Sequence, residues 1–307
     1  MISVKDGDAR PKSSLFLTTV YSDMDATVAK WIESQLDGNA LVMPKREFIP
    51  PSMSVQEYSR MVGEMMEESK TVAKIVALQH AGYEVKATGE GAKVQSLQPG
   101  SKAEGILQPN DVVVSAQGQK IETATDLVNL VRRQKPGSTL SLTVKRGEQT
   151  FDAQLGTKES DTEPGIAVIG ILIKTHLFGH NLPVQIDIDS ENIGGPSAGL
   201  MFTLGIIDSL EKGGLAPGHR IAGTGTISLD GTVGPVGGVA QKVMGAEEAG
   251  AEYFLAPGDN FETAKRAAKQ LRVVRVDKVD DAVAFLKELK PAAGTSRLRG
   301  TALGLAA

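Results

Sequence analysis

In the first third of the chain, the spacing of apolar and polar residues is typical of one strand followed by helices. Residues 14–20 form a short apolar run typical of a strand, and a helix is expected around 26–36. A longer helix is predicted to begin after Ser54, which precedes a glutamate by the spacing of a capping box, and to run to about His80. Gly82 then ends it. The apolar positions of this helix recur along one stripe: Met61, Met65, Val72, Ile75 and Val76.

Residues 82–157 change to short alternating strands around one amphipathic helix, which is predicted over 123–131. Pro-Gly and Gln-Gly dipeptides signal turns, and strands are expected at 94–97, 112–115, 140–144 and 150–155. Within this unit the chain reads Pro-Gly-Ser-x-Ala-x-Gly-x-Leu-x-x-x-Asp-Val-Val. The unit resembles a PDZ domain of the bacterial protease type, which implies a partly open β-barrel.

A polar stretch, residues 158–164, is interpreted as a linker, after which a buried strand is expected at 165–173. Strand and helix patterns therefore occur on both sides of the PDZ-like unit. That unit is predicted to be inserted in, or to precede, one discontinuous fold to which residues 1–81 also belong. The tail, 291–307, is rich in Ala, Gly, Ser and Thr and is expected to be disordered.

Residues 192–199 read Asn-Ile-Gly-Gly-Pro-Ser-Ala-Gly, and an apolar run follows at once. Pro suits the first position of a helix, and the glycines before it permit a tight loop. The first N–H groups of a helix have no partner within it and act as anion donors. Ser197 is therefore predicted to lie beside the site of an oxyanion. The loop around that site is expected to comprise Gly195, Pro196 and Ala198.

A candidate base, Lys242, occurs further along, where a glycine-rich loop leads into another predicted helix. A free lysine amine has a pKa of about 10.4 and is a poor base at neutral pH. Burial disfavours the ammonium form and lowers that pKa. In an apolar pocket, a neutral Lys242 is expected to take the proton of a serine hydroxyl. Its neighbours in the sequence are apolar, as such a pocket needs: Val239, Ala240, Val243 and Met244.

Together the two motifs resemble the proteolytic domain of Lon-type serine proteases over roughly residues 165–290. The second motif reads Thr-Gly-x-Ile-x-Leu-x-Gly-x-Val-x-Pro-x-Gly-Gly-x-x-x-Lys. The resemblance implies that Ser197 is the nucleophile, that Lys242 is the general base, and that Thr224 helps to hold both in place. Lon enzymes commonly carry an acidic residue three places before the serine. This chain has Gly194 there, which predicts a differently regulated site.

PDZ domains bind an extended peptide at a sheet edge, often through its C-terminal carboxylate. By the PDZ resemblance, the carboxylate-binding loop comprises Gly82, Tyr83, Glu84 and Val85. Glu84 stands where most PDZ loops have a second glycine, and its charge would repel a carboxylate. Three roles therefore stay open for this unit: binding of C-terminal or internal peptides, gating of the active site, or packing without a ligand.

Composition excludes several other classes of function. The 307 residues predict about two domains, and 41% hydrophobic with 23% charged residues is ordinary for a globular protein. A net charge of −4 gives no basic surface for nucleic acid. The absence of cysteine excludes disulfides and a thiol nucleophile. His176 and His180 lack the His-Glu pairing of zinc proteases, so neither a metal nor another cofactor is expected.

The chain contains no apolar stretch long enough to span a membrane, and its first residues lack the apolar core of a signal peptide. Relatives with this layout usually carry a membrane anchor, so the resemblance implies a membrane-associated protein with the protease on the extracytoplasmic face. A cytoplasmic soluble variant is the alternative. No phosphate-binding P-loop occurs, whereas Lon carries an ATPase module. The implied enzyme is ATP-independent.

The sequence thus predicts an α+β protein that combines a Lon-type proteolytic domain with a PDZ domain. The expected function is a Ser-Lys endopeptidase that cleaves flexible polypeptide segments presented or gated by the PDZ domain. The alternative is a non-catalytic PDZ scaffold with a silent hydrolase core. A homo-oligomer is a further expectation, because Lon-type domains tend to form rings. Neither nucleic acid nor ATP is expected as a partner.

Overall fold

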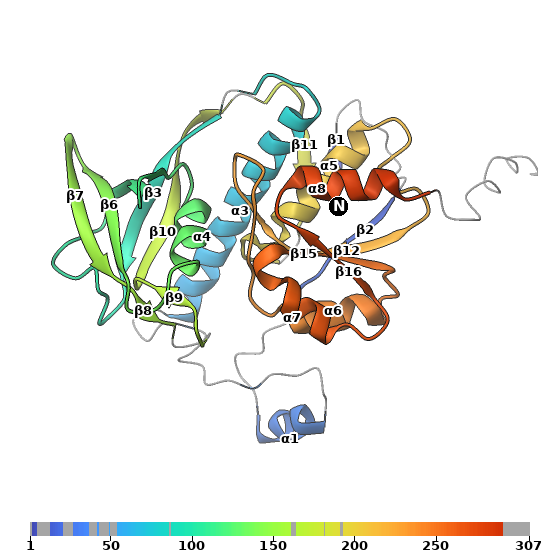
Figure 1. The fold of residues 1–307 in the computed structure, drawn as a ribbon, viewed down its shortest axis with the longest axis horizontal. Coiled ribbons are helices and arrows are strands. Elements are labelled where there is room, and N and C mark those ends of the chain that lie inside the picture. Colours follow the sequence, from blue (N-terminus) through green and yellow to red (C-terminus); the bar gives the residue numbers. More distant parts are fainter. Residues whose placement is uncertain are drawn as a thin grey trace, which may run out of the picture.

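Two lobes, each built around a larger sheet, make up most of the described part of the chain (Figure 1). The computed structural model describes residues 2–4, 13–20, 27–36, 42, 49, 54–85, 87–160, 164–180, 182–190 and 193–290. The tail that was expected to be disordered and residues 161–163 of the predicted linker lie outside the described residues. Both lobes combine helices with strands, which confirms the expected α+β class.

The first lobe contains a parallel sheet of four strands in the order β16-β15-β12-β2. Although β2 and β12 lie far apart in the sequence, they are direct neighbours in this sheet. The N-terminal segment therefore shares a sheet with strands that follow the predicted PDZ unit. The strands comprise β2 (Ser14–Leu17), β12 (Arg220–Gly223), β15 (Tyr253–Pro257) and β16 (Arg272–Val276).

Helices cover both faces of the parallel sheet. Alternate strand residues divide between two cores: Ile221 and Leu255 enter one, whereas Ala222 and Phe254 enter the other. The first core also contains residues of α3 (Val55–His80), α5 (Gly199–Leu210) and α8 (Val279–Glu288). The second contains residues of α6 (Val239–Glu248) and α7 (Phe261–Ala267).

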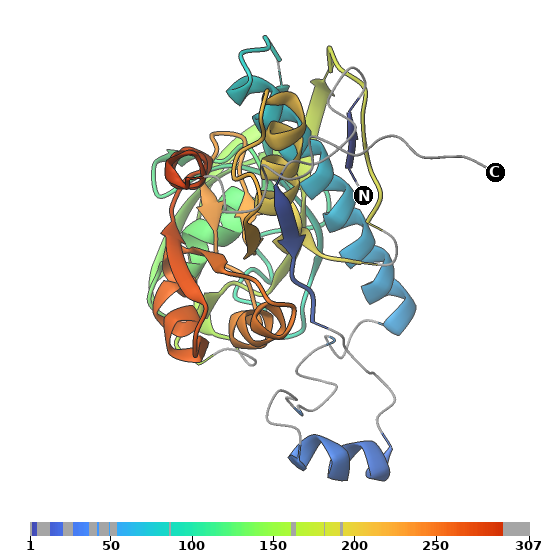
Figure 2. The same cartoon turned by 90° about the vertical axis from the view of Figure 1, so that its right-hand side faces the viewer.

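The N-terminal elements follow the predicted pattern. α3 begins with a capping box, in which Ser54 Oγ accepts the Glu57 N–H at 3.2 Å and Glu57 Oε2 accepts the Ser54 N–H at 2.8 Å. In the first half of this helix Met66 is buried, whereas Met61 and Met65 of the predicted stripe are only half-buried. The helix expected around 26–36 is α1 (Val28–Leu36), which stands apart from both lobes (Figures 1 and 2). β1 (Ile2–Val4) pairs antiparallel with β11 (Ile186–Ile188).

The second lobe contains an antiparallel sheet in the order β10-β3-β4-β6-β7, with β5 beside β4. α4 (Ala124–Arg132), the predicted amphipathic helix, packs on it and starts with a capping box at Thr123. Among the described strands, β10 and β7 end this sheet without meeting, so it does not close into a barrel. The strands comprise β3 (Ala87–Leu97), β4 (Val112–Ala116), β5 (Gln119–Lys120), β6 (Thr139–Arg146), β7 (Gln149–Gly156) and β10 (Ile171–His180).

The position of β10 differs from the sequence prediction. Residues 165–173 were expected to begin the Lon-like domain, but β10 pairs antiparallel with β3 and places Ile173 in the core of the second lobe. Part of the predicted linker forms β8 (Lys158–Glu159), which pairs with β9 (Ala167–Val168). Pairing between distant strands has no local signal, because it depends on which sheet edge is available in the folded chain.

Candidate active site

Ser197 lies in η1 (Pro196–Ala198), a single 3-10 turn directly before α5. Gly195 precedes this turn with a φ of +87°, a left-handed conformation that favours glycine. The Ser197 side chain is half-buried, whereas that of Ala198 is buried. The predicted oxyanion loop is therefore folded as a tight turn that presents one hydroxyl at the start of a buried helix.

Two hydrogen bonds connect this loop to α3. The Gly195 N–H donates to the Val62 carbonyl at 2.8 Å, and Ser69 Oγ donates to the Pro196 carbonyl at 3.1 Å. Because the Gly195 N–H is bonded in this way, an oxyanion would have to use other donors of the loop. A Cβ on Gly194 would stand 2.9 Å from Val62 Cγ2, so the space that a side chain would need is filled by α3.

α6 places Lys242 beside the serine. Gly238 caps the start of this helix with a φ of +64°, and its carbonyl accepts the Lys242 N–H at 3.1 Å. The side chain of Lys242 is almost fully enclosed, with the residue 4% exposed. Its Nζ lies 2.8 Å from Ser197 Oγ and 2.9 Å from Thr224 Oγ1. The three residues singled out in the sequence therefore meet at one point.

Thr224 follows the end of β12 and is 1% exposed. Its hydroxyl donates to the Ser197 carbonyl at 3.0 Å, and the Gly225 N–H donates to the same carbonyl at 2.9 Å. The Leu200 N–H in turn donates to the Gly225 carbonyl at 3.0 Å. These bonds attach the residues that follow the strand to the backbone directly after the serine side chain.

Burial lowers the pKa of Lys242 from 10.5 to about 8. The physical cause is desolvation, which penalises the ammonium form more than the neutral amine. At neutral pH the neutral fraction is then roughly 300-fold larger than for a lysine in water. The site therefore holds an amine that can accept a proton near physiological pH, within hydrogen-bond distance of one hydroxyl.

A cavity of about 240 Å³ runs from Lys242 along α6 and the end of β2. Most of its lining is apolar and small, and one wall follows a single face of the helix. The lining residues are Phe16, Leu17, Thr18, Thr19, Ala222, Lys242, Gly245, Ala246, Ala249 and Ala251.

A family model of the Lon protease C-terminal proteolytic domain matches residues 177–288, and a PDZ domain model matches residues 78–157. The chain combines a PDZ domain with a Lon proteolytic domain. Both resemblances expected from the sequence are thereby confirmed. The matched part of the Lon domain includes Ser197, Thr224 and Lys242.

Lon proteases of several bacteria are similar to parts of this chain. The Lon protease of Desulforamulus reducens is 31% identical over 259 residues, which is 82% of this chain and 30% of the relative. Lon protease 2 of Bacillus subtilis is 33% identical over 96 residues, which is 31% of this chain and 16% of the relative. The chain thus spans less than a third of the length of these relatives.

Solved PDZ domains of SdrC-like proteins from Listeria are similar to the PDZ part. The domain from Listeria monocytogenes is 23% identical and covers 29% of this chain and 92% of its own, with a TM-score of 0.27. The domain from Listeria innocua is 26% identical, and the match covers 30% of this chain and 99% of that domain, with a TM-score of 0.26.

The predicted carboxylate-binding loop of the PDZ domain lies at the C-terminus of α3. The N–H groups of Gly82 and Tyr83 donate to carbonyls in the last turn of that helix, at 3.0 Å each. Glu84 is exposed, whereas Val85 is buried in the core shared with the Lon domain. Two N–H groups of this loop are therefore bonded within the chain, and peptide binding here stays a prediction.

Two other expectations concern metals and membranes. Among the described residues, no group of three or more His, Asp or Glu side chains could hold a metal ion. His176 lies 3.6 Å from Glu90, and the side chain of His180 is outside the described part. No described helix combines the length and the apolar composition needed to cross a bilayer.

Sequence reasoning missed the residues that support the site from other elements. Val62 and Ser69 of α3 hold the serine loop. Asn260 holds the glycine-rich loop before α6, because its Oδ1 accepts the Val236 N–H at 2.8 Å and its Nδ2 donates to the Val236 carbonyl at 3.1 Å. A local signal existed for Ser69 alone, which is a polar residue on the apolar stripe that continues to Val72.

Proposed function

We propose that this chain is a serine endopeptidase that uses a Ser197–Lys242 dyad and cleaves flexible polypeptide segments without ATP. The observation that carries the proposal is the 2.8 Å separation between Lys242 Nζ and Ser197 Oγ, with the lysine buried. Burial favours the neutral amine, and the short separation lets that amine take the serine proton. The match to a Lon proteolytic domain supports the same chemistry.

In the first half of the proposed reaction, the enzyme forms an ester. Neutral Lys242 accepts the hydroxyl proton of Ser197, while Oγ bonds to the substrate carbonyl carbon and the carbonyl oxygen takes up the electron pair. Backbone N–H donors of the serine loop other than that of Gly195 stabilise the resulting oxyanion. When the oxyanion collapses, the C–N bond breaks, and the Lys242 ammonium gives its proton to the leaving amine.

In the second half, water releases the product. Neutral Lys242 takes a proton from a water molecule, whose oxygen bonds to the ester carbon. Collapse of this second oxyanion breaks the bond to Oγ, and the lysine ammonium returns the proton to Ser197. The enzyme is restored, and the net change is the addition of one water across the peptide bond.

Thr224 is proposed to orient the lysine. Its hydroxyl donates to the Ser197 carbonyl, so the lone pairs of Oγ1 are left to accept from Lys242 Nζ. An amine that donates one N–H to Thr224 keeps its own lone pair for the proton of Ser197. Thr224 would therefore set the direction of proton transfer without exchanging a proton itself.

The proposed substrate is a flexible segment of a polypeptide. The cavity beside Lys242 has room for a side chain but not for a folded element, and its lining is mainly apolar. The sequence contains no P-loop motif for an ATP-driven unfolding step. The PDZ domain is proposed to present such segments or to gate their access.

The test measures cleavage of a fluorogenic peptide and of casein without nucleotide. Ser197→Ala and Lys242→Met are each expected to lower the rate by roughly a thousandfold or more, because each removes one half of the dyad. Lys212→Met, at an exposed position, is the matched control for loss of a lysine charge. Retained cleavage in either dyad variant, with the urea unfolding midpoint unchanged, would refute the assignment.

Covalent labelling separates the enzyme from the non-catalytic scaffold. A fluorophosphonate probe is expected to label Ser197 in the wild type and to react far more slowly in Lys242→Met. Absence of both labelling and cleavage would favour the scaffold. The predicted homo-oligomer and membrane association are tested separately, by molar mass in solution and by cosedimentation with lipid vesicles.

A further inference from the structure

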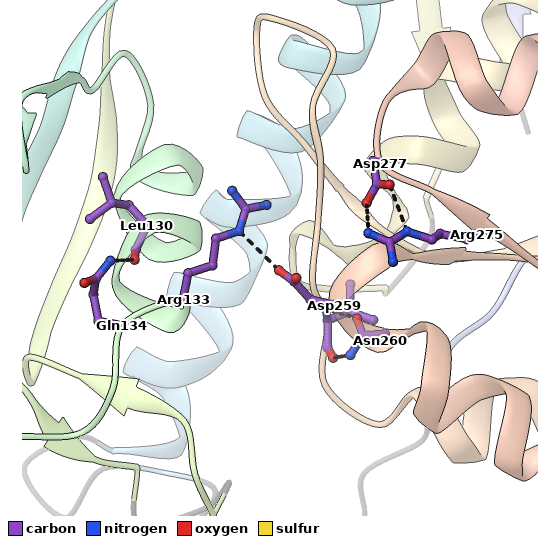
Figure 3. A network of polar contacts seen from close by, with 8 residues as sticks. Leu130, Arg133, Gln134, Asp259, Asn260, Arg275 and Asp277 are labelled. Atoms are coloured by element: carbon purple, nitrogen blue, oxygen red, sulfur yellow. Dashed lines mark hydrogen bonds and ion pairs between the residues drawn. The ribbon is translucent and has the colours of Figure 1, made fainter.

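Helix α4 of the PDZ domain and the residue that follows it, Arg133, contact the Lon domain at two positions one helical turn apart. Asn129 is 5% exposed and lies against Gly234: a Cβ on Gly234 would stand 2.3 Å from Asn129 Nδ2 and 2.4 Å from Oδ1. Arg133 Nε lies 3.4 Å from Asp259 Oδ2 (Figure 3). The PDZ domain therefore touches the Lon domain through a buried amide and an ion pair.

The buried contact is made with a hairpin beside the dyad. β13 (Thr226–Ile227) pairs with β14 (Val233–Gly234), and Thr226 lies opposite Gly234. Thr224, whose hydroxyl contacts both the Ser197 carbonyl and Lys242 Nζ, lies two residues before Thr226 on the same segment. Two peptide units therefore join the hairpin to the candidate site.

The ion pair reaches the segment that leads to α6. Asp259 belongs to η2 (Gly258–Asn260), whose last residue holds the Val236 backbone by two hydrogen bonds (Figure 3). The side chains of Arg133 and Asp259 are 54% and 45% exposed, and exposed ion pairs are weak. The amide contact differs from the ion pair in being buried.

Two buried polar atoms meet at that contact without a hydrogen bond. Asn129 Oδ1 and Thr226 Oγ1 are shielded from solvent and lack a partner among the described residues. Each is 2.4 Å from the point where a Cβ on Gly234 would stand, so both face the same small space. The Thr226 hydroxyl is a donor and Asn129 Oδ1 is an acceptor, so a local adjustment of this contact would let the two atoms pair. Because unpaired buried polar groups are costly, that pairing is favoured.

We propose that Asn129 is a positioning residue for the dyad: by seating on Gly234 and pairing with Thr226, it sets the placement of Thr224. The inference rests on the proposed peptidase function. Asn129 touches neither substrate nor the reacting atoms, and it acts through the hairpin. The seating of the PDZ domain thereby controls turnover at Ser197. A PDZ domain that merely delivered substrates would instead change KM for long substrates and leave kcat for a short peptide unchanged.

The experiment compares Asn129→Ala, Thr226→Val and Thr226→Ser with Val128→Ala, an exposed position on the same helix. kcat and KM are measured on a short fluorogenic peptide from about pH 6 to about pH 10, which spans the lysine titration. Asn129→Ala and Thr226→Val are expected to lower kcat roughly tenfold with KM unchanged, because the dyad is misplaced rather than removed. The pH at which kcat reaches half of its maximum should also increase in these two variants. Thr226→Ser, which keeps the hydroxyl, should resemble the wild type.

The unfolding midpoint separates positioning from general destabilisation. The urea unfolding midpoint of each variant is measured beside its kinetics, and a loss of kcat in Thr226→Val with the midpoint unchanged cannot come from unfolding. The inference would be overturned if kcat and its pH dependence were unchanged in both Asn129→Ala and Thr226→Val. It would also be overturned if kcat fell only in proportion to a lower unfolding midpoint. If the wild type does not cleave, the proposed function fails. In that case the pKa of Lys242 is measured by NMR titration in the wild type and in each variant. If this pKa is identical in all of them, the proposed role of Asn129 is overturned.

Discussion

At the scale of residues, the proposed chemistry depends on the partners of one buried amine. Lys70 is also buried, but its Nζ lies 2.7 Å from the carboxylate oxygen Oε1 of Glu67. Among the residues that the structure describes, Lys242 Nζ has the hydroxyls of Ser197 and Thr224 as its hydrogen-bond partners. Burial without a charged partner is what lowers its pKa and suits it to act as a base.

Cleavage is expected to increase with pH as Lys242 loses its proton. Since the neutral amine is the base and its pKa is lowered to about 8, kcat/KM should reach half of its maximum near that pH and level off above it. The measurement is the pH profile of peptide cleavage at constant ionic strength. A limb centred near the ordinary lysine value of 10.5, or a rate that falls across this range, would contradict the assignment of Lys242.

The same shift has a thermodynamic consequence. The unfolded chain holds the Lys242 proton up to about pH 10.5, whereas the folded protein releases it near pH 8. Unfolding between these values takes up a proton, so the contribution of Lys242 to the free energy of unfolding increases with pH in this window. Urea unfolding should show that the free energy of unfolding of the wild type increases relative to that of Lys242→Met as the pH rises through this window.

At the scale of elements, α3 joins the two domains to the serine loop. Ser69 bonds to the loop, while the neighbouring Glu68 accepts the Thr175 N–H of β10 at 3.1 Å and also the Thr175 hydroxyl. Thr175 Oγ1 in turn accepts the Ala124 N–H at the start of α4, at 2.8 Å. Burial raises the pKa of Glu68 to about 7, and the nearby charge of Asp126 acts in the same direction.

Glu68 is therefore expected to make stability depend on pH. Its folded pKa lies above the ordinary 4.5, so its contribution is fully present below about pH 4.5 and is lost as the pH rises through about 7. Glu68→Gln keeps an acceptor for Thr175 and removes the charge. The variant should be more stable than the wild type at pH 8, with the difference disappearing at acid pH.

Urea unfolding at about pH 5 and about pH 8 measures this difference, since these values lie on either side of the titration. Glu64→Gln, on an exposed part of the same helix, is the matched control. If Glu68→Gln changed the free energy of unfolding equally at both pH values, the charge of Glu68 would not destabilise the folded protein.

At the scale of the whole molecule, the chain crosses between the domains more often than its linear order suggests. β2 and α3 precede the PDZ sheet in sequence but pack with β12 and α5, which follow it. β10 also follows the part matched by the PDZ model, yet it completes the PDZ sheet. The smallest unit that could be removed cleanly therefore extends to the end of β10.

Two deletions test this organisation. Removing residues 87–157 should leave β10 without β3 and expose Ile173, so that the product aggregates through its free strand edge. Removing residues 87–180 and joining the ends with a Gly/Ser linker should leave a remainder that unfolds cooperatively. Thermal unfolding and size-exclusion chromatography of the two products are compared. Equal folding of both would show that β10 does not depend on the PDZ sheet.

Much of the candidate site could be predicted because its signals are local. The capping box of Ser54 and Glu57, the turn at Gly195 and the helix start after Pro196 each need only neighbouring residues. The pairing of Ser197 with Lys242 came from two motifs matched to one family rather than from local physics. Nothing in either segment measures the distance between their side chains.

The sequence by itself indicated many of the elements, the presence of a PDZ and a Lon-type unit, and the residue types of the candidate dyad, because periodicity, caps and motif spacing are encoded over a few residues. Tertiary structure alone decided that Lys242 is enclosed, that β10 joins the PDZ sheet and that Asn129 rests on Gly234. Burial, strand partners and contacts between domains depend on residues far apart in the chain, and their energies exist only once those residues have been brought together.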